Sequence, residues 1–350
     1  MNDNKPGNAR KWVFNTLFLI ILFAGTIIII RRHNTTWQED RGMTFGTFYN
    51  IKYRSEDNFK ADIEAELRKV DASLSMFNDS SIVSKLNRGE DVLPDSMFMT
   101  VFSKGMEVAR NTGGLYDITV APLCNAWGFG FKHSLDVTPA VIDSLLQFVG
   151  YERISISGRR IVKDDPRCMI DLSSIAKGYG CDAVASLLKR NGIYDYMVEI
   201  GGEVTASGTN SRGEAWRIGI NKPVDDTLGV NHDIQAVIRI ENSGVATSGN
   251  YRNYYISDGK KYSHTINPVT GYPVSHNLLS ATVIADDCMT ADAYATAFMV
   301  MGLEQAKLYA DTSAAIKAAY FISDDGNGGY RADFTRDMAL FLDNGGKAKE

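Results

Sequence analysis

The chain has 350 residues, 44% of them hydrophobic and 23% charged, a composition that excludes an intrinsically disordered protein. Its net charge is −5, but residues 1–32 hold five Lys/Arg and one Asp, so the rest of the chain has 32 basic and 41 acidic residues and a net charge of −9. This acidic excess excludes a broad nucleic-acid surface, and a bound polyphosphate would need a metal ion to screen the repulsion.

The N-terminal region contains an uncharged apolar run over residues 12–30, with two basic residues on each side. Nineteen residues rising 1.5 Å each can cross about 30 Å of hydrocarbon. The run is longer than the core of a cleavable signal peptide, and no A-x-A-like exit follows it. It is apolar on every face, which argues against a half-buried core helix. We therefore expect an uncleaved transmembrane signal anchor.

These features divide the chain into four parts: a short N-terminal segment (1–11), the anchor (12–30), a polar tether (31–42) and one folded domain (43–345). Basic residues flank both ends of the anchor nearly equally, so the positive-inside rule does not fix its orientation. Because the first segment is so short, we expect the N-terminus inside and the large domain exported.

The first half of the domain predicts a strand, three helices and a strand pair, which cover residues 43–55, then 58–77, 94–114 and 138–150, then 152–158 and 159–164. A strand (168–172) and a helix (174–193) follow, and the rest is rich in strands, interrupted by helical spacing over 289–312. The expected class is α+β, a mixed α/β domain with substantial antiparallel sheet.

The four cysteines, Cys124, Cys168, Cys181 and Cys288, are scattered and form no C-x-x-C pair. Neither a zinc site nor a redox motif is therefore indicated. Burial as small hydrophobic residues is the expected role, although an exported location would permit a disulfide.

The segment DLSSIAKGYGCD (171–182) predicts the start of a helix. Asp171 would close a strand, Ser173 or Ser174 would cap the helix, and Lys177 would add a positive charge one turn in. Free backbone N–H groups at a helix start favour an anion such as phosphate. An ordinary strand–helix corner uses the same residue types, so this motif alone leaves both interpretations open.

Two later segments also combine polar groups with a defined backbone. In HTINPVTGYPV (264–274), glycine and two prolines would hold a loop that presents His264 to a ligand, or merely form a rigid turn. In TADAYATAFMVMG (290–302), Asp292 and Thr296 lie four residues apart on one helix face and could share a hard cation such as Mg²⁺. A capping Asp with a helical Thr is the alternative explanation.

Glycine-rich segments complete the set of candidates. GGLYDITVAPLCNAWGFG (113–130) contains aromatic residues that could sandwich a planar ring or belong to the core. EIGGEV (199–204) and VATSGNYRNYY (245–255) place glycines beside strands, where a ligand can approach the backbone closely.

Taken in order, these segments resemble the ApbE family, flavin transferases that move FMN from FAD onto a protein threonine. The resemblance covers about residues 43–340 and rests on FGTFYNI, SMFNDSSIVSKLN, GGLYDITVAPLCNAWGFG, DLSSIAKGYGCD, VEIGGEV, ATSGNY, HTINPVTGYPV and TADAYATAFMVMG. It implies an ApbE-like, T-fold-like domain.

The resemblance also implies roles for individual residues. The positions it assigns to FAD contact are Phe45, Phe77, Leu115, Tyr116, Asp117, Asp171, Lys177 and Ile266. The positions it assigns to the metal are Ser174, through its backbone carbonyl, Asp292 and Thr296, with Ala295 beside them. Asp292 and His264 are the implied catalytic residues, His264 as the base for the acceptor threonine.

The sequence departs from the family pattern at four positions, none of which removes a proposed metal ligand or the lysine. Asn250 and Asn267 stand where many members have Asp, Phe77 where Tyr is frequent and Phe45 where Met is frequent. These changes bear on the fit of the substrate and not on the reaction.

The implied reaction is Mg²⁺-dependent: a threonine oxygen attacks the FMN-side phosphorus of FAD, and AMP leaves. The implied acceptors are subunits of membrane electron-transfer complexes, which places the protein in a bacterial inner membrane, single-pass, with its domain in the periplasm. No acceptor-type D-G-x-x-S-G-x-T sequence occurs in the chain. Two alternatives remain: an FAD pyrophosphatase that yields FMN and AMP, and a non-enzymatic FAD-binding protein.

Overall fold

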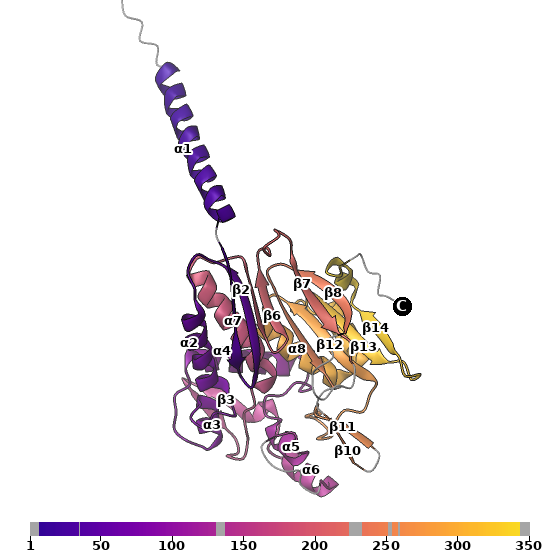
Figure 1. The fold of residues 1–350 in the computed structure, drawn as a ribbon. Coiled ribbons are helices and arrows are strands. Elements are labelled where there is room, and N and C mark those ends of the chain that lie inside the picture. Colours follow the sequence, from indigo (N-terminus) through magenta and orange to yellow (C-terminus); the bar gives the residue numbers. More distant parts are fainter. Residues whose placement is uncertain are drawn as a thin grey trace, which may run out of the picture.

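The structure, a computed structural model, describes residues 7–34, 36–130, 137–223, 233–250, 254–257 and 260–343. One antiparallel sheet of eight strands runs through the centre of the domain, in the order β1-β2-β5-β6-β9-β12-β13-β14 (Figure 1). Its strands are β1 (Trp37–Thr44), β2 (Thr47–Arg54), β5 (Tyr196–Ile200), β6 (Glu203–Ser207), β9 (Ser243–Gly249), β12 (Leu278–Ala285), β13 (Ala318–Asp324) and β14 (Tyr330–Phe334). This sheet and the helices around it confirm the predicted α+β class.

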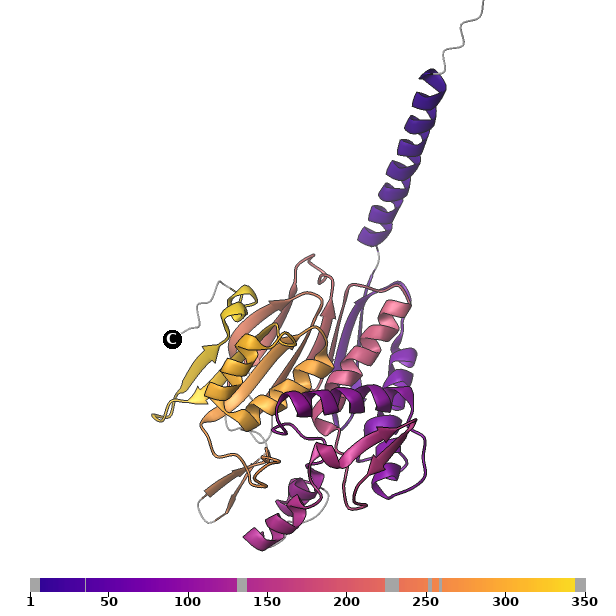
Figure 2. The ribbon, with the colours of Figure 1, turned by 180° about the vertical axis from the view of Figure 1, so that it is seen from behind.

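Helices cover one face of the sheet, as the view from behind shows (Figure 2). They are α2 (Lys60–Leu74), α4 (Ser96–Asn111), α7 (Ser173–Arg190), α8 (Cys288–Met301) and α9 (Leu303–Thr312). Helix α8 is buried along almost its whole length, which explains why small and apolar residues surround its full circumference in the sequence. The helices predicted from apolar spacing at residues 58–77, 94–114, 174–193 and 289–312 are confirmed.

Smaller elements extend the domain around this two-layer core. A two-stranded ribbon of β7 (Trp216–Asn221) and β8 (Ile234–Ile240) packs on the sheet face that the helices leave open (Figure 1). The other short elements are α3 (Ile82–Asn87), α5 (Ala121–Ala126), α6 (Pro139–Leu146), β3 (Ile154–Ser157), β4 (Arg160–Lys163), β10 (Tyr254–Ser257) and β11 (Lys260–Ser263). The predicted helix at 138–150 and the strand pair after it are confirmed as α6 and as β3 with β4.

The start of the domain differs from the prediction of a tether over 31–42 and one strand over 43–55. Strand β1 already begins at Trp37, and the chain then turns at Phe45 and Gly46 into β2. Both turn residues have positive φ, 51° and 72°, the conformation of a two-residue hairpin turn. Phenylalanine rarely adopts positive φ, so the sequence did not indicate a turn there.

The strand predicted for residues 168–172 is wrong. Cys168, Ile170 and Leu172 are fully buried, which gives the segment its strand-like pattern, but it pairs with none of the strands that the structure describes. Instead the Asn87 side chain accepts from the Ile170 N–H and donates to the Ile170 carbonyl, both at 2.8 Å. A side-chain amide therefore satisfies the backbone groups that a neighbouring strand would otherwise satisfy.

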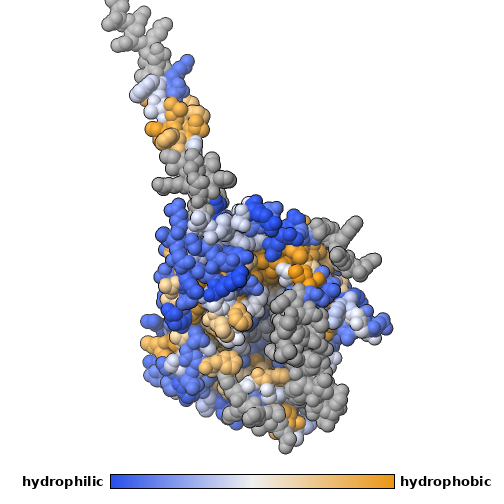
Figure 3. All heavy atoms as spheres, viewed as in Figure 1, coloured by the Kyte–Doolittle hydropathy of each residue, from blue (hydrophilic) through white to orange (hydrophobic). Residues whose placement is uncertain are grey.

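Helix α1 (Gly7–Asn34) contains the predicted anchor and projects from the domain (Figure 1). Its described side chains, residues 11–26, are largely apolar and exposed (Figure 3), with Trp12 71% and Leu22 55% accessible. Among the residues that the structure describes, no helix combines the length and the hydropathy needed to cross a membrane. Residues 27–30 of the predicted span lie outside the described side chains, and the anchor stays a prediction.

Candidate active site

Four of the predicted site residues lie on two helices that touch, Ser174 and Lys177 on α7 and Asp292 and Thr296 on α8. The Gly178 N–H donates to Oδ2 of Asp292 at 3.0 Å, and Asp292 is buried. A Cβ on Gly178 would lie 2.5 Å from the Cys288 carbonyl oxygen and 2.8 Å from the Asp292 Cβ. Glycine is therefore required for this approach of the two helices.

The same N–H connects two of the proposed metal ligands. In an α-helix the N–H of residue 178 faces the carbonyl of residue 174, so the Ser174 carbonyl and the Asp292 carboxylate both lie beside the Gly178 N–H. Thr296 follows Asp292 by one turn on α8, and its Oγ1 lies 3.2 Å from the Ser248 Oγ on β9. The three predicted metal ligands thus all offer oxygen atoms, the ligand type that Mg²⁺ prefers, and they lie on the two helices that meet at Gly178.

The alternative assignment of Asp292 as a helix cap is excluded. Asp287 is the N-cap of α8, because its Oδ1 accepts from the Thr290 N–H at 2.7 Å. Ala295 is fully buried and carries no side-chain oxygen, so only its backbone carbonyl could reach a metal. Within the described ranges, no three His, Cys, Asp or Glu side chains group as a metal site. The proposed set contains a single carboxylate, so it would not form such a group.

A Gly178→Ala substitution tests the helix contact. The added methyl would meet backbone atoms of α8, so the helices must separate, and we expect a loss of about 1–3 kcal/mol in unfolding free energy together with reduced activity. Gly180→Ala is the control, because its Cβ would meet only side-chain atoms that can shift, the Phe45 ring at 2.7 Å and the Ile200 Cδ1 at 3.3 Å. Thermal melting of both variants checks this; equal melting temperatures would contradict it.

Beside the contact between α7 and α8, the described carboxylates outnumber the described ammonium groups. The Lys177 ammonium forms an ion pair with the buried Glu203 carboxylate, and Asp292 is a second carboxylate near the same ammonium. Burial raises the pKa of Asp292 and of Glu203, and Lys177 lowers each of these pKa values in part. Burial alone would lower the pKa of Lys177, but Asp292 and Glu203 raise it above its ordinary value. Among the described side chains, two buried carboxylates therefore share one ammonium, and Glu203 Oε2 is buried with no hydrogen-bond partner there.

The start of α7 is built differently from the prediction. Leu172 occupies the N-cap position, and neither Ser173 nor Ser174 caps the helix. The Asp171 Oδ1 instead accepts from the Ser173 N–H at 2.8 Å, and the Ser174 hydroxyl donates to the Tyr116 hydroxyl at 3.1 Å. Ser174 thus uses its hydroxyl to hold a neighbouring loop, which leaves its main chain as the group for a ligand.

That neighbouring loop holds the second group of predicted FAD positions. Asp117 accepts through Oδ1 from the N–H and hydroxyl of Thr119, at 2.7 and 2.6 Å, and through Oδ2 from the Tyr151 N–H at 2.7 Å. Tyr116 is buried and Leu115 half-buried. The Asp117 carboxylate therefore fixes the loop, and the loop lies against α7 through Tyr116.

The two predicted aromatic FAD positions lie in separate turns. Phe45, in the β1–β2 turn, packs over Gly180 of α7. Phe77 lies between α2 and α3, and its side chain is 78% exposed.

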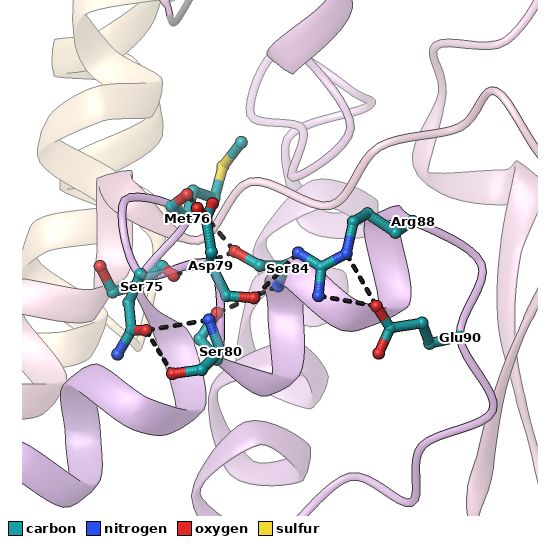
Figure 4. A network of polar contacts seen from close by, with 9 residues as sticks. Ser75, Met76, Asp79, Ser80, Ser84, Arg88 and Glu90 are labelled. Atoms are coloured by element: carbon teal, nitrogen blue, oxygen red, sulfur yellow. Dashed lines mark hydrogen bonds and ion pairs between the residues drawn. The ribbon is translucent and has the colours of Figure 1, made fainter.

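Polar contacts order the segment that carries Phe77 (Figure 4). The Ser84 hydroxyl donates weakly to the Ser75 and Met76 carbonyls, each at 3.4 Å. Arg88 donates to the Asp79 carbonyl at 2.8 Å and also pairs with Glu90. An exposed ring on an ordered segment is suited to stacking on a planar ligand.

The loop 264–274 is rigid and docks on the segment 113–130. The Asn267 Oδ1 accepts from two N–H groups of its own loop, and Trp127 Nε1 donates to the Gly271 carbonyl at 2.8 Å. His264 is half-buried, with its ring edge-to-face with Phe129 at 6.4 Å. Ile266 is buried and forms an isolated antiparallel β-bridge with Pro273. The predicted loop is confirmed, and it holds His264 in a fixed position.

Sequence reasoning missed Glu203 and Gly178. The segment EIGGEV predicts a glycine turn, and nothing in its local pattern indicates that Glu203 meets Lys177. The signal that could have found Glu203 was Lys177 itself, because a lysine near a buried helix start needs a carboxylate partner.

A separate cleft lies on the face of the sheet opposite the helices. It has a volume of about 750 Å³, and its lining includes Trp37, Lys52, Glu199 and Trp216. None of the predicted FAD or metal positions lines it, so it is distinct from the α7–α8 site.

Comparison with known proteins gives consistent matches. The model of the ApbE family matches residues 45–321. A protein of Vibrio cholerae named FAD:protein FMN transferase is 38% identical over 296 residues, which cover 81% of this chain and 87% of that protein. The protein of the same name from Escherichia coli K12 is 35% identical, over 79% of this chain and 82% of its own.

Solved structures agree with these matches. The flavin transferase ApbE from Vibrio cholerae has a TM-score of 0.78 at 35% identity, covering 88% of this chain and 100% of that one. The flavinyl transferase ApbE from Pseudomonas stutzeri, in its apo form, has a TM-score of 0.78 at 32% identity, covering 88% and 97%.

Proposed function

This chain belongs to the ApbE family, and from that premise we propose that it is a FAD:protein FMN transferase. It transfers FMN from FAD to a threonine hydroxyl of an acceptor protein and releases AMP. The observation that carries this proposal is the cluster of the half-buried Lys177 with the buried Glu203 and Asp292 at the α7–α8 contact. The family match also spans every predicted site residue.

The chain's own groups can perform the transfer as follows. Lys177 places a positive charge beside the dinucleotide phosphates, and the ordered loops hold FAD in line for attack. The threonine oxygen forms a bond to the FMN phosphorus while the bond from that phosphorus to the AMP oxygen breaks. His264 accepts the threonine proton, because histidine is the side chain that most often serves as a general base near neutral pH.

We propose that Mg²⁺ is held by the Asp292 carboxylate, the Thr296 hydroxyl and the Ser174 carbonyl. The excess of one buried carboxylate in the cluster supports this assignment. When bound, the ion screens the pyrophosphate and stabilises the leaving phosphate.

Chelation is expected to stop the reaction without unfolding the protein. EDTA treatment should abolish FMN transfer, added Mg²⁺ should restore it, and the far-ultraviolet circular dichroism should stay unchanged because protein groups hold α7 and α8 together, through the Gly178–Asp292 hydrogen bond and a shared apolar cluster. FMN transfer that persists after dialysis against EDTA would contradict the proposed dependence on Mg²⁺.

A His264→Asn substitution separates proton transfer from binding. We expect FMN transfer to fall about 100-fold or more, because a positioned general base contributes at least that factor. FAD affinity, followed by quenching of flavin fluorescence, should change little. A matched loss of affinity and rate would instead make His264 a binding residue.

Incubation with FAD, Mg²⁺ and a candidate acceptor distinguishes the three possible activities. A fluorescent acceptor band on a denaturing gel supports transfer. Free FMN with an unmodified acceptor supports hydrolysis, and unchanged FAD supports binding alone.

We also propose that residues 12–30 anchor the protein in a bacterial inner membrane, with the domain in the periplasm beside acceptor subunits of electron-transfer complexes. The uncharged sequence of this run and the exposed apolar side chains of α1 support the proposal. Recovery of the full chain in the membrane fraction, with its domain open to added protease in spheroplasts, is the expected result. Recovery in the soluble fraction would contradict it.

A further inference from the structure

Two of the four cysteines meet at the α7–α8 contact. Cys181 lies on α7, Cys288 is the first residue of α8, and both are fully buried. Both are free thiols, and each contributes to the pKa shift of the other through a side-chain interaction. Each thiol otherwise donates only to a backbone carbonyl, Cys181 to Glu203 and Cys288 to Val245, both at 3.3 Å.

Contacts other than the thiols hold these two positions together. Asp182, beside Cys181, accepts from the Cys288 N–H at 3.1 Å and from the Met289 N–H at 2.8 Å. The close approach of Gly178 to the Cys288 carbonyl fixes the helices from the other side. These contacts therefore hold the two cysteines next to each other on facing helices, as a disulfide requires.

The pairing is selective. Cys181 and Cys288 share one apolar cluster with β2 and β5. Cys168 belongs to a different cluster, beneath α4 and α8, and Cys124 packs at the edge of a third, around Trp127.

We propose that Cys181 and Cys288 form a disulfide that ties α7 to α8. The bridge would lie one helical turn from Lys177 on α7 and one turn from Asp292 on α8. It would therefore hold together the two helices that carry the proposed FAD–metal site. The inference depends on the proposed export only for where oxidation occurs in the cell, since disulfides persist in oxidising compartments.

The oxidant is another disulfide, either of a thiol–disulfide oxidoreductase or of a small molecule. One cysteine thiolate attacks it to form a mixed disulfide, and the second thiolate then displaces the reduced oxidant. Two thiols lose two protons and two electrons, which the oxidant takes up as two thiols. Burial raises the pKa of both cysteines and shields them from oxidants. The bridge therefore forms during folding or when the helices open.

The test maps the cysteines of the full chain. One sample is isolated from membranes without reductant. A second is equilibrated with glutathione disulfide at a urea concentration just below unfolding and returned to buffer. Both are alkylated, digested and analysed by mass spectrometry, which requires no FMN transfer and so stands apart from the proposed function.

We expect one cross-linked peptide pair that joins residues 181 and 288 and lacks two hydrogens, with Cys124 and Cys168 alkylated. Reduction should lower the melting temperature by roughly 5 °C or more, because the bridge closes a loop of more than 100 residues. Cys181→Ser should abolish the cross-link and this shift, and Cys168→Ser should keep both. Four alkylated cysteines in both samples, or cross-links spread over other pairs, would overturn the proposal.

Discussion

Replacing Asp292 with alanine is expected to abolish FMN transfer and leave the protein folded. The substitution removes the only carboxylate among the proposed metal ligands, and we expect at least a 100-fold loss of rate, the scale seen when one preorganised electrostatic group is deleted. The fold should survive, because Lys177 and Glu203 then form a balanced pair. Steady-state transfer assays and circular dichroism measure the two effects separately.

Asp287→Ala is the matched control on the same helix. It removes the N-cap bond to Thr290, which costs about 1 kcal/mol of stability, and should leave the transfer rate near that of the unmodified protein. Equal activity in the Asp292 and Asp287 variants would remove Asp292 from the site.

Replacing Lys177 with methionine is expected to destabilise the protein strongly as well as to inactivate it. The change leaves the carboxylates of Glu203 and Asp292 buried beside each other without a cation. Removing one partner of a fully buried ion pair costs about 3–5 kcal/mol, and this is an upper bound here because the Lys177 side chain is 33% exposed and solvent screens it. Thermal melting at pH 7 should therefore show a large drop, and FAD affinity should fall with it.

The stability loss caused by Lys177→Met should depend on pH, and the pKa shifts of the two carboxyls give the direction of that dependence. Burial raises the pKa of both carboxyls above the unfolded value, so their unfavourable contribution grows as the pH rises and vanishes when they are protonated. The loss of unfolding free energy caused by Lys177→Met should become smaller as the pH falls. Adding Glu203→Gln should restore part of the stability at pH 7. A deficit that is independent of pH and unchanged in the double variant would contradict the charge argument.

Local relations in the chain were predictable from the sequence. Asp292 and Thr296 share a helix face because they lie four residues apart, and the loop 264–274 is rigid because its turn residues are adjacent. The helices that form the cover of the sheet followed from apolar spacing alone.

Relations that cross the fold were not predictable in this way. Glu203 meets Lys177 only because β6 runs beneath α7, and a side chain 83 residues away replaces the strand expected around Ile170. The turn at Phe45 depends on a backbone conformation that its residue type does not favour. In each case tertiary contacts decided the outcome over the local pattern.

The mass of an acceptor domain incubated with the full chain, FAD and Mg²⁺ tests the central claim most directly. The account predicts a gain of one FMN, located on a threonine by peptide mapping, and no gain with the Asp292→Ala variant. An acceptor of unchanged mass, recovered together with free FMN and AMP, would contradict it and identify a pyrophosphatase.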